Sequence, residues 1–102
     1  MKVKKVSVAC MAGMLVILGS VVHAGDINAG KAISASCAGC HGAQGISSNP
    51  LWPNLAGQQA GYLVKQLVAF RDGSRSDPMM TLMARPLTDT DIQNLAAWYS
   101  SL

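Results

Sequence analysis

Apolar side chains recur at steps of three and four positions in two segments of the chain, as expected for helices with one buried face. The first segment runs from Gln58 to Asp72, and Gly73 stands where a left-handed residue would end such a helix. The second begins at Thr88, because Thr88 and Asp91 have the spacing of a capping box. The positions that recur at these steps are Tyr62, Leu63, Gln66, Leu67 and Phe70 in the first segment and Ile92, Leu95, Ala96 and Tyr99 in the second. We therefore predict two amphipathic helices here.

A shorter helix is predicted ahead of these two. Asp26 can cap a helix that runs from about Ile27 to Ser36. Residues 42–57 are rich in Gly, Pro, Ser and Asn, and residues 74–87 contain two prolines, so both stretches are predicted to be loops. No stretch alternates convincingly between apolar and polar residues as a strand would. The sequence predicts an all-α fold of three main helices. Loops this long in a short chain need an explanation beyond connection, and wrapping a large flat ligand is one.

The first 24 residues have the pattern of a leader rather than of a folded domain. Three lysines among the first five residues precede an uncharged apolar run over residues 6–22, and a Val-His-Ala cleavage site ends at Ala24. We expect a signal peptide at residues 1–24, a domain at residues 25–102 and export to the periplasm. The alternative is an uncleaved membrane anchor, since an apolar run of about 17 residues is at the short limit for crossing a bilayer.

Removing the leader changes the charge of the protein. The formal net charge of +3 belongs to the leader lysines, because the remaining 78 residues carry five cationic and five anionic side chains. Nucleic-acid binding would need a basic stripe, and none remains. A domain of this size commonly needs a disulfide, a metal or a cofactor to complete its core.

One short segment indicates which cofactor completes this small domain. It is Cys37-Ala38-Gly39-Cys40-His41. Two thiols at this spacing suit thioether bonds to two vinyl groups on one porphyrin edge, and the adjacent imidazole suits the iron. Cys-x-x-Cys-His is therefore the pattern of covalent c-type haem attachment, with His41 as the proximal iron ligand. We expect one haem c bound through Cys37 and Cys40.

Three other interpretations of this segment are weaker. A zinc site wants four ligands, whereas the domain offers two cysteines and one histidine. A thioredoxin-like redox pair wants a βαβ setting, which the pattern does not show. A structural disulfide across the segment would leave His41 unexplained.

The second axial ligand of the iron is expected from a cluster of methionines. All three Met residues of the domain, Met79, Met80 and Met83, lie within five positions in a loop that contains prolines. Methionines that only fill a core would be expected to scatter over the helices. A thioether ligand raises the reduction potential of a haem and closes the iron to other ligands.

From residue 25 onward the chain resembles the short class I c-type cytochromes of bacteria, and also one half of the dihaem cytochromes that deliver electrons to terminal oxidases. The resemblance implies a class I cytochrome c fold whose first and last helices cross beside one haem, with His/Met ligation and electron shuttling. Four stretches carry it: residues 37–42, Leu55-Ala56-Gly57-Gln58, Phe70-Arg71-Asp72-Gly73 and Leu87-Thr88-Asp89-Thr90-Asp91-Ile92.

The resemblance also selects one methionine. In such cytochromes the ligand Met stands seven residues before the Leu that begins the final Leu-Ser/Thr-Asp signature. Counting back from Leu87 gives Met80, with Met79 as the runner-up and Met83 as the third choice.

Further expectations concern the haem pocket and the glycine of the first helix. Similar cytochromes hold the ligand imidazole by a hydrogen bond to a proline carbonyl. Pro50 fits this position by spacing, with Pro53 as the alternative, while both prolines could instead only shape the loop. Trp52 is a candidate pocket residue near the haem, and the core is the other place open to it. Trp98 and Tyr99 are expected in the helix–helix core, and Gly30 can allow the first and last helices to approach closely.

These residues predict a single-electron carrier rather than an enzyme. Its partners would be redox proteins, an electron donor and an acceptor such as a terminal oxidase or reductase, with membrane contact only through partners or an uncleaved leader. A haem peroxidase or gas sensor would need the methionines to leave the iron open. The electron-entry subunit of a larger enzyme is a third possibility that the sequence does not separate from a free shuttle.

Overall fold

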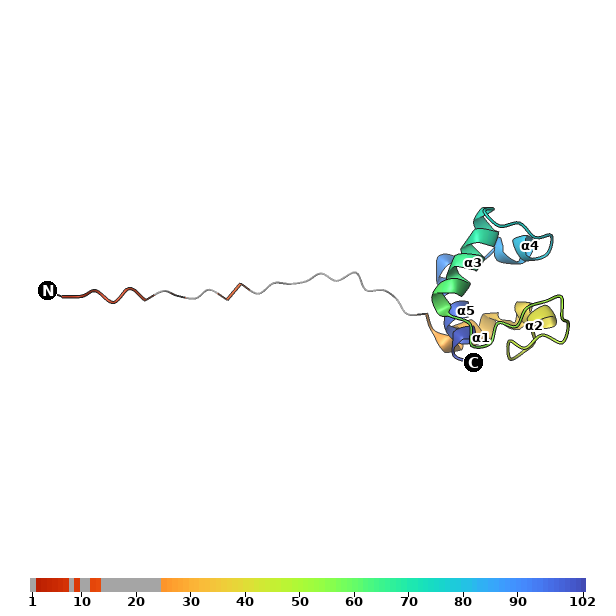
Figure 1. The fold of residues 1–102 in the computed structure, drawn as a ribbon, viewed down its shortest axis with the longest axis horizontal. Coiled ribbons are helices and arrows are strands. Elements are labelled where there is room, and N and C mark those ends of the chain that lie inside the picture. The colour runs from red at the N-terminus through yellow and green to blue at the C-terminus, as the bar shows by residue number, and fades with distance from the viewer. Residues whose placement is uncertain (1, 8, 10–11, 14–24) are drawn as a thin grey trace.

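The computed structural model describes residues 2–7, 9, 12–13 and 25–102, and it folds residues 25–102 into a domain of helices and loops (Figure 1). Among the described residues there is no strand, which agrees with the predicted all-α class. The predicted leader, including the cleavage site at Ala24, lies largely outside the described residues. The helices are α1 (Ile27–Ile33), α2 (Ala35–His41), α3 (Ala60–Asp72), α4 (Met80–Ala84) and α5 (Asp89–Ser100).

The first and last helices cross in direct contact at Gly30. A Cβ atom built on Gly30 would stand 1.9 Å from the backbone oxygen of Asn94 and 2.9 Å from Cβ of Trp98. Only a residue without a side chain therefore permits this crossing. Asp26 adds a second link, because its backbone N–H donates to Oδ1 of Asn94 at 2.8 Å.

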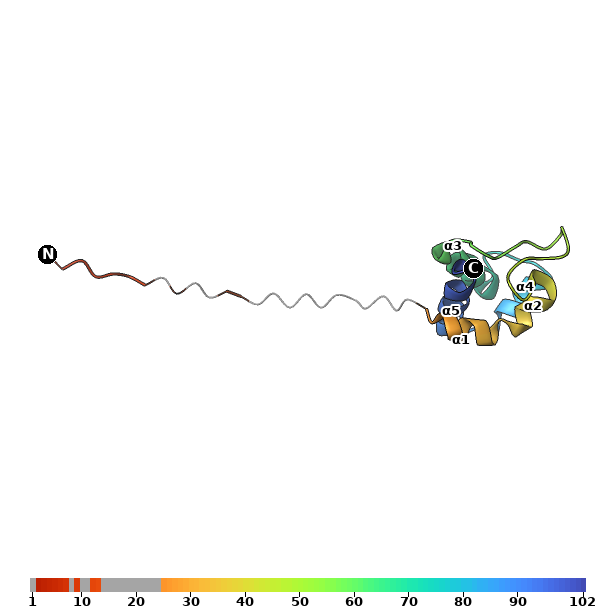
Figure 2. The same cartoon turned by 90° about the horizontal axis from the view of Figure 1, so that it is seen from below.

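The core lies where α5 packs between α1 and α3 (Figure 2). Its buried members come from α3 and α5, and Cys37 of α2 packs against them. The prediction that Trp98 and Tyr99 belong to the helix–helix core is confirmed, since their exposed fractions are 7% and 4%. The buried cluster consists of Leu63, Leu95, Ala96, Trp98 and Tyr99.

The predicted start of α1, end of α3 and start of α5 are confirmed, and each is formed by hydrogen bonds between residues close in the sequence. Asp26 accepts from the N–H of Ala29 at 3.1 Å, and Thr88 and Asp91 form the capping box of α5. Gly73 ends α3 in the left-handed conformation, with φ of 93°. The α3 helix begins at Ala60, two residues later than predicted.

The predicted helix over residues 27–36 is wrong in its C-terminal boundary. The structure bends the chain at Ser34 and then continues as α2 to His41, so the cysteines lie in a helix rather than after one. Oγ of Ser34 donates to the carbonyl oxygen of Lys31 at 2.7 Å, while the N–H of Ser34 is shared between the carbonyls of Gly30 and Lys31. Such back-bonding by a serine commonly bends a helix.

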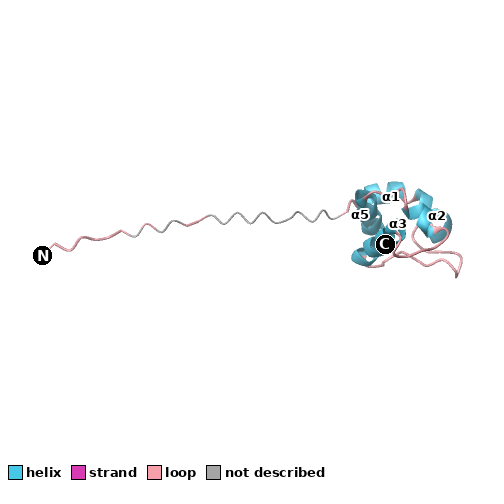
Figure 3. Ribbon diagram, turned by 90° about the horizontal axis from the view of Figure 1, so that it is seen from above, coloured by secondary structure: helices cyan, strands magenta, loops and turns pink. Residues whose placement is uncertain are grey.

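The predicted loop over residues 74–87 is also incomplete, because it contains the short helix α4. Pro78 and Pro86 flank this helix without interrupting it. Most of the remaining loop structure lies between α2 and α3 (Figure 3). No helix in the described part of the chain is long and apolar enough to cross a membrane.

Candidate haem-binding site

Helix α2 places the three residues of the sequence motif on one face. Cys37, Cys40 and His41 are three and four positions apart, which is the spacing at which side chains of a helix are neighbours. Both cysteines are free and half-buried, and His41 is buried with an exposed fraction of 7%. The local structure thus groups two thiols and one imidazole, as the sequence predicted.

His41 is held by the carbonyl of Pro53 and not by that of Pro50. Nδ1 of His41 lies 2.8 Å from the backbone oxygen of Pro53. A carbonyl oxygen can only accept a hydrogen bond, so Nδ1 carries the proton and Nε2 keeps its lone pair. Among the described residues Nε2 has no hydrogen-bond partner, which leaves it available to a metal. The preference for Pro50 was therefore wrong, and the alternative Pro53 is correct.

The loop between α2 and α3 explains this choice of proline. The N–H groups of Leu55 and Ala56 both donate to the carbonyl of Gly45, at 2.8 and 3.0 Å. These bonds bring the stretch that follows Pro53 back against the start of the loop. Leu51 next to Pro50 is 85% exposed, so Pro50 lies at the outer turn of the loop.

Two polar residues that the sequence reasoning missed also hold this loop. Oγ of Ser47 donates to the carbonyl of Cys40 at 3.0 Å, and the backbone N–H of Ser47 donates to Oδ1 of Asn54 at 2.7 Å. These bonds join the end of the motif to the residue after Pro53. Ser and Asn are typical loop residues because they make such bonds, but sequence alone does not say which partners they take.

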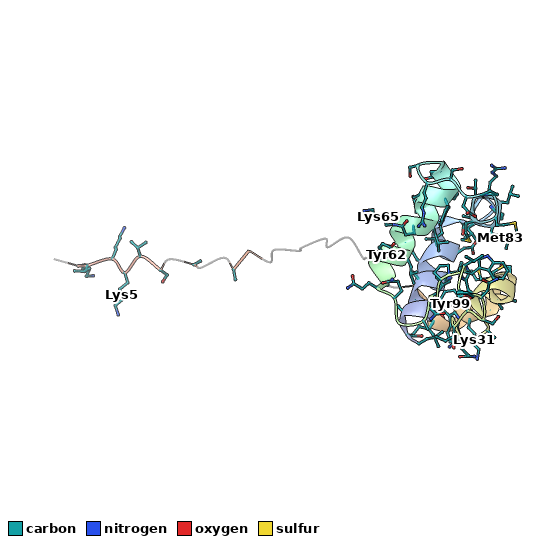
Figure 4. All side chains as sticks on the ribbon, turned by 45° about the vertical axis from the view of Figure 1, so that its right-hand side comes forward. Lys5, Lys31, Tyr62, Lys65, Met83 and Tyr99 are labelled. Carbon is teal, nitrogen blue, oxygen red and sulfur yellow. The ribbon has the colours of Figure 1, made fainter. Side chains whose placement is uncertain are left out.

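The methionine cluster lies on or beside α4, at the same end of the domain as α2 (Figures 1 and 2). Met79 is 60% exposed and Met83 38% exposed, whereas Met80 is half-buried. Met83 lies at the edge of the domain in Figure 4. This order of burial favours Met80, although the identity of the iron ligand stays a prediction.

Asp77, two residues before Met79, shapes the backbone of this cluster. Oδ2 of Asp77 accepts hydrogen bonds from the backbone N–H groups of Met80, at 2.8 Å, and Met79, at 2.9 Å. These bonds stabilise the carboxylate and hold the pKa of Asp77 below its usual value. The sequence reasoning did not single out Asp77, although Asp77 and Pro78 form an Asp-Pro pair, which is a recognisable signal for the start of a turn.

Tyr99 connects the core to the motif. Its hydroxyl is buried with no hydrogen-bond partner among the described residues, as is the indole N–H of Trp98. Burial raises the pKa of Tyr99 above its usual range, and the neighbouring Cys37 thiol adds to the rise.

Trp52, the other aromatic candidate, is 43% exposed, and its place in a haem pocket stays a prediction.

This set of donors fits a covalently attached haem. Two unpaired thiols on one helix face suit two thioether bonds, and an imidazole fixed through Nδ1 presents Nε2 to an iron. A hydrogen bond from the other ring nitrogen to a carbonyl is the usual support for a histidine that binds a metal. Cys37 and Cys40 would hold the haem, and His41 would bind its iron.

Comparison with known proteins gives the same assignment. The family model of cytochrome c matches residues 27–102. A cytochrome c4 of Thiocapsa roseopersicina is 49% identical over 78 residues, which cover 76% of this chain and 40% of that protein. Cytochrome c-554(548) of Halomonas halodenitrificans is 46% identical over 81 residues, covering 76% of this chain and 98% of the relative.

A solved structure shares the fold. The crystal structure of reduced recombinant cytochrome c4 from Pseudomonas stutzeri superposes with a TM-score of 0.73 at 42% identity, covering 76% of this chain and 46% of that one. The chain therefore spans about half the length of the cytochrome c4 relatives and nearly all of cytochrome c-554(548). The class I cytochrome c fold predicted from the sequence is confirmed. This chain belongs to the cytochrome c family, whose haem c is bound covalently, and it carries Cys37, Cys40 and His41 in the Cys-x-x-Cys-His arrangement.

Proposed function

We propose that this protein is a periplasmic single-electron carrier with His41 and Met80 as the axial ligands of one haem c. The observation that carries the proposal is the hydrogen bond from Nδ1 of His41 to Pro53, because it leaves Nε2 as an oriented ligand. When bound, haem c supplies a one-electron couple at its iron. The protein contributes orientation, exclusion of water and control of the potential.

Each group of the chain has a separate task in this proposal. Cys37 and Cys40 tether the cofactor so that a small domain does not lose it. Pro53 keeps the imidazole of His41 in one orientation and one tautomer. The sulfur of Met80 raises the potential and excludes added ligands, since a thioether on the sixth position closes the iron.

A haem peroxidase or gas sensor is the main competing function. Peroxide chemistry would need an acid–base group beside an open iron position. The segment from Pro78 to Ala84, which carries all three methionines of the domain, has no titratable side chain, and the carboxylate of the preceding Asp77 is engaged by the backbone N–H groups of Met79 and Met80. The lack of a free acid–base group in the methionine segment favours an electron carrier over a peroxidase or gas sensor.

The partners in this proposal are redox proteins, namely a donor and an acceptor such as a terminal oxidase or reductase. No Lys, Arg, Asp or Glu occurs between Lys31 and Lys65, so the motif and the loop after it present no charge of their own. Docking through a small and transient interface fits a carrier that must release each partner.

The test is the behaviour of the purified haem protein in both redox states. A carrier should cycle reversibly between two spectra, and the reduced protein should not bind carbon monoxide. Haem should stay with the polypeptide on a denaturing gel. A reduced protein that binds carbon monoxide readily would contradict the proposal and favour the peroxidase or sensor.

The periplasmic location has its own test. The order of charge, apolar run and cleavage site predicts that the protein from its native host begins at Gly25 and is recovered in the periplasmic fraction. Amino-terminal sequencing of the purified protein measures this. An intact leader in the membrane fraction would establish the anchor instead.

A further inference from the structure

Asp77 forms a hydrogen-bonded turn with the residues around Met80, the first residue of α4. Its Oδ2 accepts from the backbone N–H of Met80 at 2.8 Å and of Met79 at 2.9 Å. Its own N–H donates to Oγ1 of Thr81 at 3.0 Å, and its carbonyl accepts from the N–H of Thr81 at 3.1 Å. Four hydrogen bonds thus join Asp77 to the three residues from Met79 to Thr81.

These bonds matter because α4 cannot hold its own conformation. A helix of five residues is far below the length at which helices are stable in isolation. The backbone of Met80 is set by its first-turn hydrogen bond to Asp77, and the backbone sets the direction in which Cα–Cβ points. The N–H of Met80 would have no acceptor inside the helix, since it is the first helical residue.

We propose that Asp77 is the positioning residue for Met80, and that its carboxylate fixes the direction from which the Met80 sulfur meets the iron. The inference rests on the proposed function, in which Met80 is the axial ligand. Asp77 acts through the backbone of Met79 and Met80. Losing it should increase the fraction of time for which the sulfur is away from the iron.

The experiment uses the complete haem protein and the variants Asp77→Ala and Asp77→Asn. Two quantities are measured in the oxidised state: the near-infrared sulfur-to-iron charge-transfer band and the rate of cyanide binding. Asp77→Ala should weaken the band and speed cyanide binding about fivefold, which is the size of effect expected when a side-chain acceptor for backbone N–H groups at the start of a helix is lost. Asp77→Asn removes the same charge but keeps an acceptor oxygen, so it should stay close to the wild type.

The matched control is Thr88→Ala, which removes the cap of α5, a helix without methionine. It should lower the midpoint of thermal unfolding and leave the band and the cyanide rate unchanged. If Asp77→Ala also lowers only the unfolding midpoint, Asp77 has only a structural role in the turn and the inference is overturned.

Two further results distinguish a failure of the Met80 ligand assignment from a failure of the role of Asp77. A wild-type protein without the band would overturn the ligand assignment and the role of Asp77 together, whereas a normal wild-type band that Asp77→Ala does not change overturns the role of Asp77 alone. If Asp77→Ala does not fold, Thr81→Val replaces it, because valine keeps the shape and removes the acceptor of the Asp77 N–H. It should speed cyanide binding by a smaller factor, and an unchanged rate would overturn the inference.

Discussion

Replacing Met80 by alanine is expected to abolish the sulfur-to-iron charge-transfer band of the oxidised protein and to open the iron to cyanide. The reduction potential should fall by roughly a few tenths of a volt, since axial ligands set haem potentials over a range of about 0.8 V. Covalent haem should remain, because Cys37, Cys40 and His41 are untouched. Absorption spectra and a redox titration of the purified variant measure all of these effects.

The other two methionines supply the controls. Met79 is 60% exposed and Met83 38% exposed, so neither is as well placed as Met80 to serve a buried cofactor. Met83→Leu conserves apolar volume and should keep the band while costing less than about 1.5 kcal/mol of stability. An unchanged band in Met80→Ala would transfer the ligand role to Met79 or Met83.

Replacing Gly30 by alanine is expected to have the largest effect on folding. The added Cβ would stand 1.9 Å from the backbone oxygen of Asn94 and 2.5 Å from its carbonyl carbon. Backbone atoms cannot swing aside as the end of a side chain can, so α1 and α5 must separate. Overpacking costs about 1–3 kcal/mol, and because Gly30→Ala clashes with backbone we expect a loss near the upper end of this range, a large part of the stability of a small domain. Denaturant titration of the haem protein measures the loss.

Gly61→Ala is the matched control for that substitution. Gly61 lies in α3, and a Cβ there would meet no atom within 4 Å. Alanine is the better helix former by about 0.5–1 kcal/mol, so this variant should be slightly more stable than the wild type. Equal stability of Gly30→Ala and the wild type would show that the first and last helices do not cross as described.

Features of this protein that depend only on neighbouring residues could be predicted from the sequence. The Asp26 cap, the left-handed Gly73 and the Thr88 capping box all close hydrogen bonds within one helical turn, so a short pattern specifies each of them. The haem attachment segment is similar, because Cys37 to His41 act as one local unit. The apolar spacing of the two long helices also predicted their buried faces.

Which groups distant in the sequence meet depends on how the chain folds in three dimensions. Whether Pro50 or Pro53 faces His41 depends on bonds from Leu55 and Ala56 to Gly45 across the loop, and either proline fits the spacing alone. The close approach of Gly30 to Asn94 likewise depends on how α5 packs against α1.

The helical conformation of the two cysteines and the presence of α4 also depend on the tertiary structure. The bend at Ser34 and the turn at Asp77 each let a short helix form beside residues that sequence patterns assign to loops. Helices of five to seven residues have too few internal hydrogen bonds to persist alone, so their formation depends on the packing around them. The apolar periodicity of α3 and α5, with 13 and 12 residues, is long enough to be recognised in the sequence. Short helices such as α2 and α4 form only because the surrounding fold supports them.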